Sequence, residues 1–203
     1  MVSLLDSAGL KKMLAAVSLR WLAVGQRTIE AYERLIRNQA DNEPAFQEFF
    51  EAHPLLLDPL AFRVWPKPDL SGYRVPDFVL ARTDDSYLVI EIETLGKGIM
   101  IRNGQLSSKA THAVAQATEY RSFLMDRFER VRGVFSNFHA PDALVVIGLE
   151  RSLTTEQQSA LRRENEQRAH LAIVSFDTLA ARASAIAQNL VKGRVKIERG
   201  RLI

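Results

Sequence analysis

Apolar and polar positions alternate along residues 87–94, a pattern typical of a β-strand whose two faces meet different surroundings. Ile90 and Ile92 point to one face of this strand, whereas Glu91 and Glu93 point to the other. Two carboxylates at positions i and i+2 therefore project from the same face, roughly 7 Å apart along the strand. The sequence predicts a strand with an acidic end.

A second apolar segment, residues 73–81, precedes this strand and contains Asp77 just before a run of apolar residues. The polar residues 83–86 predict a turn that folds the two segments side by side. Asp77 then joins Glu91 and Glu93 in one small volume. Carboxylates that close repel one another unless a cation lies between them. Because hard divalent cations prefer oxygen ligands, we interpret these three acids as metal ligands.

The rest of the chain alternates between helical and strand patterns. Apolar residues at steps of three and four predict helices, and short continuous apolar runs predict strands buried on both faces. Helices are predicted over residues 3–38 with a break near Gly25, 43–52, 107–132, 154–169 and 177–190, and further strands over 61–65, 143–148 and 171–176. Strands that alternate with helices predict right-handed parallel crossovers. The expected fold class is α/β, with a mixed central sheet flanked by helices.

The 203 residues fit one domain with a small N-terminal appendage. We expect a helical arm over residues 1–40, packed on the core or on a second subunit, and an α/β domain over residues 41–203. Cysteine is absent, which excludes disulfides and thiolate metal sites and fits a cytoplasmic protein. No run of about 18 apolar residues predicts a membrane span, and Asp6, Lys11 and Lys12 interrupt any signal-peptide core.

The charge pattern is compatible with a nucleic-acid partner and does not require one. The formal net charge of +3 is modest for a chain of this length, so binding would need a local basic face. Residues 192–201 carry five basic residues against one acid. This tail suits an edge strand, where Lys and Arg discourage unwanted pairing, and it equally suits contacts to DNA phosphates.

Four short motifs occur in an order that resembles the PD-(D/E)XK nuclease superfamily. The more specific resemblance is to the Shedu-type domain of bacterial anti-phage defence nucleases, and it covers about 80 of the 203 residues. The matching pieces are Glu43-x-x-Phe46-Gln47-x-Phe49-Phe50-Glu51-x-His53-Pro54, Pro76-Asp77-Phe78, Val89-Ile90-Glu91-Ile92-Glu93-Thr94 and Thr111-His112-Ala113-x-x-Gln116. Residues 1–40 and the tail beyond residue 190 lie outside the resemblance.

The resemblance implies a restriction-endonuclease-like core that hydrolyses DNA phosphodiester bonds with Mg²⁺ or Mn²⁺ in phage defence. A homo-oligomer formed through the helical arm is a separate expectation, since the arm lies outside the resemblance. Asp77 and Glu91 would hold the metal, which positions water and lowers its pKa. Glu43 would orient a metal-bound water, although its helix face also suits plain exposure to solvent. Gln116, with His112 beside it, would position the phosphate.

Glu93 departs from the family pattern, in which the motif usually ends in lysine. A lysine stabilises the charge that develops on the phosphate, and a carboxylate does not. Glu93 is then an extra metal ligand or a general base, as in some nucleases of this superfamily. The alternative is a degenerate site in a protein that binds nucleic acid or mediates assembly without cutting. Lys97 and Lys109 are candidates to supply the missing charge.

Each candidate residue also has a simpler interpretation. Asp77 suits a turn after proline, His112 suits an exposed position, and Glu91 with Glu93 suits a sheet face in contact with water. An exposed sheet face conflicts with the helix predicted after residue 107, because the apolar stripe of that helix must pack on a neighbouring surface.

Overall fold

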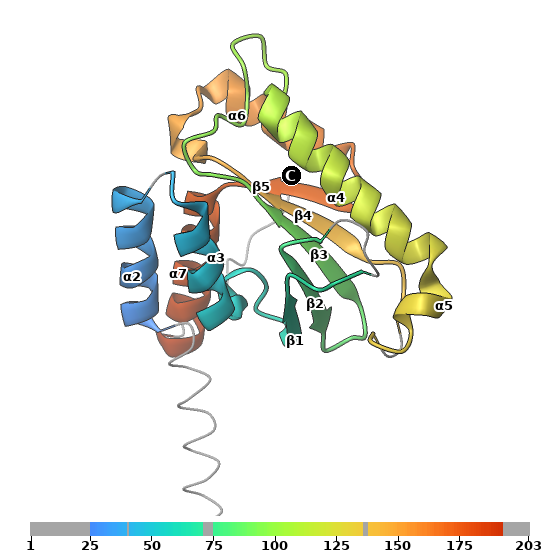
Figure 1. Cartoon of the computed structure of the whole chain (residues 1–203). Coiled ribbons are helices and arrows are strands. Elements are labelled where there is room, and N and C mark those ends of the chain that lie inside the picture. The colour runs from blue at the N-terminus through green and yellow to red at the C-terminus, as the bar shows by residue number, and fades with distance from the viewer. Residues whose placement is uncertain (1–24, 40, 71–74, 136–137, 193–203) are drawn as a thin grey trace, which may run out of the picture.

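The computed structural model describes residues 25–39, 41–70, 75–135 and 138–192, and the structural statements below concern these residues. Its middle layer is a five-stranded sheet with the order β1-β2-β3-β4-β5 (Figure 1). The strands are β1 (Ala61–Pro66), β2 (Phe78–Arg82), β3 (Tyr87–Ile92), β4 (Asp142–Val146) and β5 (Leu171–Val174). The helices are α2 (Gln26–Asn38), α3 (Glu43–Ala52), α4 (Ser108–Asp126), α5 (Phe128–Val131), α6 (Thr155–Glu166) and α7 (Phe176–Lys192), with short 3-10 turns η1 (Pro54–Leu56) and η2 (Glu150–Ser152).

The sheet is mixed, as the sequence predicted. Strands β1, β2 and β3 form an antiparallel meander, whereas β3, β4 and β5 run parallel. The predicted turn at residues 83–86 joins β2 to β3, and Asp85 within it has a φ of 63°. Aspartate is one of the few side chains that adopt this left-handed conformation readily. The meander brings the start of β2 beside the end of β3.

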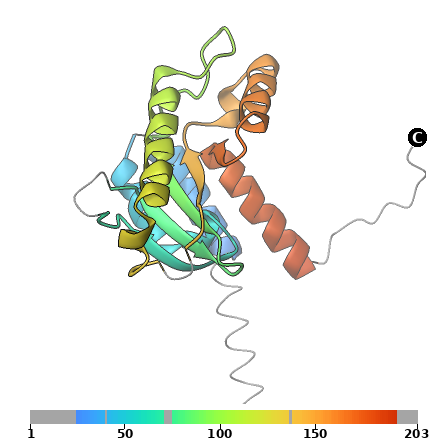
Figure 2. The same cartoon turned by 90° about the vertical axis from the view of Figure 1, so that its right-hand side faces the viewer.

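Helices cover both faces of the sheet (Figures 1 and 2). Leu88, Ile90 and Ile92 pack in one buried cluster with residues of α2, α3 and α7. Val89 points the other way, into a cluster that contains residues of α4, and α6 packs with α4 over β4 and β5. The alternation read from residues 87–92 is therefore confirmed.

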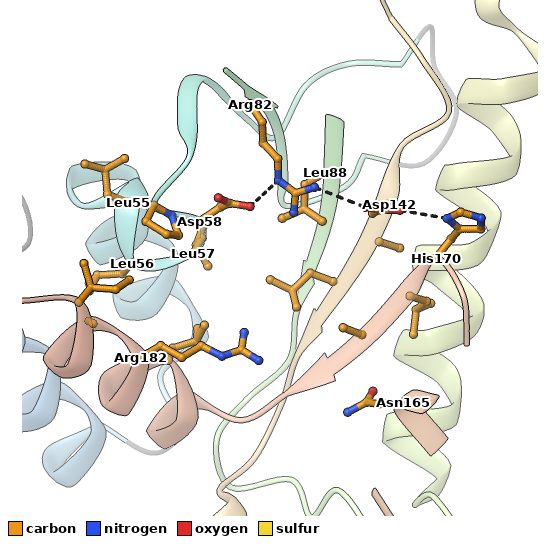
Figure 3. A pocket seen from close by; sticks show the side chains of 18 of the residues that line it. Leu55, Leu56, Leu57, Asp58, Arg82, Leu88, Asp142, Asn165, His170 and Arg182 are labelled. Atoms are coloured by element: carbon orange, nitrogen blue, oxygen red, sulfur yellow. Dashed lines mark hydrogen bonds and ion pairs between the residues drawn. The ribbon is translucent and has the colours of Figure 1, made fainter. Parts of the chain in front are cut away.

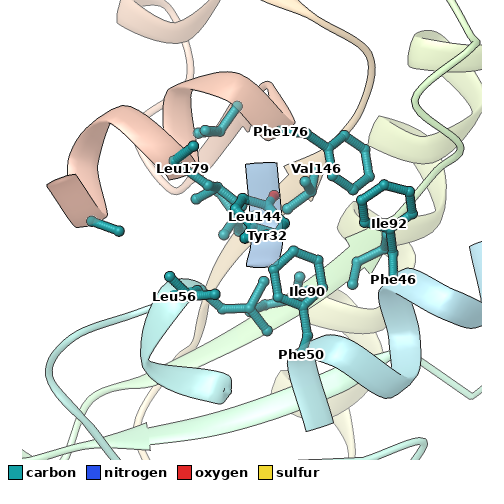
Figure 4. Close-up of a cluster of buried hydrophobic side chains, with 14 of the residues drawn as sticks. Tyr32, Phe46, Phe50, Leu56, Ile90, Ile92, Leu144, Val146, Phe176 and Leu179 are labelled. Atoms are coloured by element: carbon teal, nitrogen blue, oxygen red, sulfur yellow. The ribbon is translucent and has the colours of Figure 1, made fainter. Parts of the chain in front are cut away.

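Aromatic rings hold α3 in place at one end of this core (Figure 4). The Phe46 ring lies 4.6 Å from the Phe176 ring, and the Tyr32 ring lies 5.5 Å from the Phe50 ring, measured between centroids. Phe46 and Phe50 are one helical turn apart and fully buried. Because α3 is anchored along this side, the position of its first residue, Glu43, is fixed relative to the sheet.

Small residues let α4 approach the other face of the sheet closely. Ala110, Ala113 and Ala117 are fully buried on the side of α4 that faces the sheet, as the predicted stripe required. The side chain of Ser107 caps the helix by accepting the backbone N–H of Ala110 at 3.1 Å. The helix ends at Asp126, before the predicted residue 132, and the chain continues into the short α5.

Two predicted boundaries differ from the structure for local reasons. The last helix begins at Phe176 because Ser175 accepts the N–H of Thr178 at 3.1 Å and so caps it. Asp177 instead accepts the N–H groups of Glu150 and Arg151, each at 2.9 Å. Strand β2 begins at Phe78, so residues 75–77 of the predicted strand lie before it, and residues 73 and 74 lie outside the described residues.

The predicted N-terminal arm is described only in its second half. Helix α2 packs on the core, where Ile29, Tyr32 and Ile36 join the cluster with α3 and α7. Residues 1–24 and the basic tail from residue 193 lie outside the described residues, and the division at residue 40 stays a prediction. Within the described ranges, no helix combines the length and apolarity needed to cross a bilayer.

Tyr32 offers a test of this core. Its hydroxyl is buried and has no hydrogen-bond partner among the described residues. A buried hydroxyl without a partner is destabilising, so we expect Tyr32→Phe to raise the free energy of unfolding by about 1 kcal/mol in urea titrations. The matched control is Tyr120→Phe, since the Tyr120 hydroxyl donates to the Val75 carbonyl at 3.4 Å. The control should lose stability, and a loss of stability in Tyr32→Phe would contradict the prediction.

Candidate active site

Asp77 lies where the three antiparallel strands meet. Its side-chain Oδ2 accepts the backbone N–H of Ile92 at 2.8 Å, which ties the start of β2 to the end of β3. Its carbonyl accepts the N–H of Lys67, just beyond β1, at 2.8 Å. Asp77 is thus more than a turn residue, because its carboxylate replaces a ladder bond between two strands.

The strand register places Asp77 next to Glu91. Phe78 pairs with Ile90 in the antiparallel ladder, and Asp77 and Glu91 are the next residues along the two strands. Residues that face one another in this way have Cβ atoms about 5 Å apart. Continuation of this register by one residue would set the two predicted acids opposite each other.

Glu91 and Glu93 are both buried, each with 8% of its surface exposed. Glu91 pairs with Val145 of β4, which packs under α4, so Glu91 lies on the sheet face that α4 covers. Acidic side chains are rarely this buried unless they are paired. An exposed sheet face, the simpler interpretation of these two acids, is therefore wrong.

Lys97 supplies a positive charge directly at this site. Its ammonium forms an ion pair with the Glu93 carboxylate, in a loop that follows β3. The backbone N–H of Glu93 donates to the Val146 carbonyl at 2.8 Å, so the ladder of β3 and β4 holds the other partner in place. Of the two lysines proposed from sequence, Lys97 thus meets the acids, whereas Lys109 is exposed on α4.

Two glycines allow the Lys97 loop to lie where it does. A Cβ on Gly148 would stand 2.6 Å from the Lys97 carbonyl oxygen, and Gly148 also has a φ of 61°. Both conditions make a side chain at position 148 energetically costly. A Cβ on Gly96 would stand 2.3 Å from the Asp41 carboxylate, just before α3. The loop is therefore held closely between the end of β4 and the start of α3.

The pKa of Asp77 shows which charges share this site. Burial is the largest influence and raises the pKa of Asp77 to about 6, although the hydrogen bond from Ile92 opposes that rise. The negative charges of Glu43 and Glu93 raise this pKa further, and the positive charge of Lys67 lowers it. The charges of Glu43, Glu93 and Lys67 therefore lie close enough to Asp77 to act on it through space.

Helix α3 contributes Glu43 at its first turn. Asn42 caps the helix by accepting the N–H of Ala45 at 3.1 Å, and Glu43 is half-buried. One turn later, Gln47 is buried and donates to Glu51 at 2.9 Å. A fully solvated helix face does not describe this row, because its middle residue lies in the interior.

His112 and Gln116 lie on α4, and among the described residues their contacts do not include the candidate acids. His112 is exposed and Gln116 is half-buried. Across the described part of the chain, no hydrogen bond or ion pair joins either side chain to Asp77 or Glu93. Their predicted role in positioning phosphate stays a prediction.

The acids suit a hard divalent cation by their chemistry, since all offer carboxylate oxygens. Mg²⁺ commonly takes only one or two protein carboxylates and completes its shell with water and substrate oxygens. Among the described residues, no three His, Asp or Glu side chains are arranged to hold a metal ion. The structure thus shows the adjacent pair Asp77 and Glu91, but no closed set of three ligands that includes Glu93.

Lys67 is a charged neighbour that the sequence analysis did not select. It lies between two prolines and has a φ of 42°, a conformation that few residues other than glycine adopt. Backbone strain of this kind is often found at functional sites. The signal available in the sequence was the Pro66-Lys67-Pro68 triplet, because two rigid residues restrict the lysine between them.

A separate cavity of about 530 Å³ opens at the opposite ends of β3, β4 and β5 (Figure 3). Its floor is largely leucine and alanine, and its rim carries a chain of charges. Arg82 contacts Asp58 at 2.6 Å and Asp142 at 3.4 Å, and His170 lies 3.1 Å from Asp142. The described residues that line it include none of the four candidate acids. The cavity and the acidic cluster are therefore different features of the fold.

The fold and the acids together define a class of protein. An antiparallel meander and two further parallel strands, flanked by helices, form the predicted α/β fold with a mixed sheet, and its acids lie at the junction of β2 and β3. Residues 40–180 match the family described as "Shedu protein SduA, C-terminal". The chain belongs to this family, and the matched residues contain all four motifs on which the resemblance was based.

Comparison with solved structures gives a distant match to "Structure of EndoMS-dsDNA2 complex", with a sequence identity of 14% and a TM-score of 0.39. The match covers 67% of this chain and 44% of that chain, so this chain spans less than half the length of its neighbour. Among curated proteins, none matches this chain.

The raised pKa of Asp77 predicts how stability depends on pH. An acid whose pKa rises from 3.8 to about 6 on folding favours the folded state most below pH 3.8, and this contribution is lost as the pH rises through 6. At pH 8 the ionised carboxylate costs about 3 kcal/mol. Asp77→Asn removes the charge and keeps an acceptor for Ile92, so we expect a gain of up to about 3 kcal/mol at pH 8 that vanishes near pH 4.

Urea unfolding in EDTA at pH 4, 6 and 8 measures this difference. The matched control is Asp85→Asn, because Asp85 is exposed in the turn between β2 and β3 and asparagine also accepts its positive φ. The control should change stability little and equally at each pH. An Asp77→Asn protein that is no more stable than wild type at pH 8 would show that the carboxylate is not held at a cost.

Proposed function

We propose that this protein is a metal-dependent DNA endonuclease of anti-phage defence. The observation that carries the proposal is the burial of Glu91 and Glu93 at the end of β3, where the Asp77 carboxylate is bound to the backbone and the Lys97 ammonium pairs with Glu93. Buried acids at the junction of two strands are unfavourable for folding, so their presence indicates a role other than stability. Membership of the Shedu family supports a nuclease and a role in defence.

Asp77 and Glu91 are the residues that would hold Mg²⁺ or Mn²⁺. Asp77 immediately precedes β2 and Glu91 lies on the adjacent strand β3, and a cation would offset the repulsion between their charges. When bound, such an ion lowers the pKa of water and neutralises charge on the phosphate. The backbone of β2 and β3 fixes both residues, so the ligands require little reorganisation.

Hydrolysis needs a base for the attacking water and positive charge for the phosphate. In the proposed reaction the water oxygen bonds to phosphorus, the bond from phosphorus to one sugar oxygen breaks, and that oxygen takes up a proton. Glu93 accepts the proton that the water loses, while Glu43 orients the water by a hydrogen bond. Lys97 faces the same space and stabilises the added negative charge.

Lys97 supplies the positive charge that the family motif usually has as a lysine at the position of Glu93. The expected lysine is missing from position 93, yet the ion pair brings an ammonium to that carboxylate from four residues later. Lys67 adds a second positive charge close enough to lower the pKa of Asp77. We infer that the electrostatic role of the motif lysine has moved from the strand to the neighbouring loops.

A second candidate is a module that binds DNA without cutting it. It is favoured by Glu93 itself and by the lack of three convergent ligands in the described residues. Assembly into a homo-oligomer through residues 1–40 and a cytoplasmic location stay predictions. Light scattering after size exclusion, on the full chain and on a chain without residues 1–24, tests the assembly.

Plasmid cleavage separates the two candidates. With Mg²⁺ or Mn²⁺ we expect the full chain to nick supercoiled plasmid, and Asp77→Asn and Glu91→Gln to lose at least about 100-fold in rate. Lys97→Met should lose about 100-fold, because it removes one charge that stabilises the transition state. The control Asp85→Asn should cut like wild type. Equal nicking by wild type and Asp77→Asn would exclude the proposed catalytic site.

Metal binding has a readout that does not depend on cleavage. A ligand that binds only the folded state at ten times its Kd stabilises that state by about 1.4 kcal/mol. Mg²⁺ or Mn²⁺ at such a concentration should therefore raise the melting temperature of wild type by about 4 °C. Asp77→Asn and Glu91→Gln should show no shift, whereas Lys97→Met should keep it. The same shift in all four proteins would place the ion elsewhere.

A further inference from the structure

A short hairpin-shaped loop, residues 99–106, is closed by one isolated β-bridge and projects from the fold between β3 and α4 (Figures 1 and 2). Met100 and Leu106 form an antiparallel bridge at its base, and Ile101 donates its N–H to the Gln105 carbonyl at 2.9 Å. The hairpin begins only a few residues after Glu93 and therefore extends from the same end of the sheet as the acidic cluster.

The hairpin is fixed to the body of the protein. The side-chain amide of Gln157, on α6, donates to the Ile101 carbonyl at 3.1 Å. Gly104 turns the tip with a φ of 76°, and a Cβ there would stand 3.6 Å from the Cβ of Ala160. Ile99 at the base is fully buried. The direction in which the tip points is therefore set by α6 and the core.

The exposed residues of the hairpin combine one apolar side chain, directly after the bridge, with groups that recognise nucleic acid. Ile101 is 44% exposed, and Arg102, Asn103 and Gln105 are exposed around it. The Asn103 amide donates to the Gln105 amide oxygen at 3.2 Å, which aligns the two amides. One exposed isoleucine is ordinary on a protein surface. The isoleucine is notable because it lies on a projecting loop that is fixed to the core, next to an arginine and two side-chain amides.

The charge of the surrounding chain fits a polyanion. Residues 94–118 contain Lys97, Arg102 and Lys109 and neither aspartate nor glutamate. This stretch includes the hairpin and the first half of α4, where Lys109 is exposed near a helix N-terminus of partial positive charge. A DNA backbone that reaches the acidic cluster along this side meets basic or neutral residues throughout the stretch.

We propose that the tip of the hairpin enters the minor groove of double-stranded DNA beside the cleaved phosphate, with Ile101 wedged against a base step and Arg102 in the groove. This inference rests on the proposed function, and it specifies how the protein would hold its DNA substrate. Minor-groove proteins combine arginine and amide side chains with apolar wedges such as isoleucine. The minor groove is about 6 Å wide, so the side chains of the tip would enter it while the two chain segments of the hairpin stay outside.

The same residues disfavour single-stranded DNA as the partner. Proteins that hold single strands stack the bases on aromatic side chains. Residues 94–118 contain no phenylalanine, tyrosine or tryptophan. An aliphatic wedge with arginine suits a step that is still paired, which the protein opens partly from one groove.

The test measures binding without cleavage, in the full chain carrying Asp77→Asn. Fluorescence anisotropy gives Kd for a labelled 30-base-pair duplex, and 2-aminopurine within the duplex reports base unstacking. Adding Ile101→Ala should weaken binding about tenfold and abolish the rise in 2-aminopurine fluorescence. Adding Arg102→Ala should weaken binding and reduce the slope of log K against log salt by about 1. A minor-groove ligand such as netropsin should compete with the protein.

The matched control is Met125→Ala, because Met125 is also 44% exposed but lies near the other end of α4. It should bind like its Asp77→Asn parent. If that parent binds no duplex, the proposed function itself fails. If the parent binds but Ile101→Ala and Arg102→Ala bind equally well, with no change in 2-aminopurine fluorescence, the hairpin inference fails and the proposed function stands. Absence of competition by netropsin would overturn the assignment to the minor groove.

Discussion

The hydrogen bond from the Ile92 N–H to the Asp77 carboxylate serves two purposes that otherwise oppose each other, namely the stability of the sheet and the placement of a buried acid. It closes the antiparallel ladder where β2 begins, and it holds a buried carboxylate beside Glu91. Burial and the nearby negative charges of Glu43 and Glu93 raise the pKa of Asp77, while this bond lowers it. The fold therefore carries an electrostatic cost at one point and offsets part of it with a backbone donor. The backbone donor thereby fixes the position of the Asp77 carboxylate, and a fixed geometry is what the proposed hydrolysis requires of its ligands.

The elements around this bond act as supports for a small number of charged groups. The aromatic contacts of α3 fix Glu43, and the alanine stripe of α4 brings that helix close over Glu91. Gly148 lets the loop after β3 pass near the end of β4, and Lys97 thereby reaches Glu93. The same loop then continues into the hairpin whose tip carries Ile101. The proposed chemistry and the proposed DNA contact thus depend on one connection between β3 and α4.

Local patterns were sufficient for much of this architecture. Alternation along β3 identified the core face and the acidic face, since side-chain direction in a strand follows from spacing alone. The turn between β2 and β3 and the stripe of α4 were also readable, and the ordered motifs led to the Shedu family. Helix boundaries were less certain, as Ser175 and Asp177 show. Both residue types cap helices, and only the neighbouring backbone N–H groups of η2 decided that Asp177 bonds elsewhere.

The sequence by itself determined the α/β class and the mixed sheet, because these depend on period and order along the chain, and it selected Asp77, Glu91 and Glu93 as candidate site residues. Only the tertiary structure decided that Lys97, and not Lys109, meets Glu93, and that Lys67 acts on Asp77. It also showed that Glu91 and Glu93 are buried rather than exposed to solvent. Charges act through space over a few ångströms, and residues that are distant in sequence reach such distances only when the chain is folded.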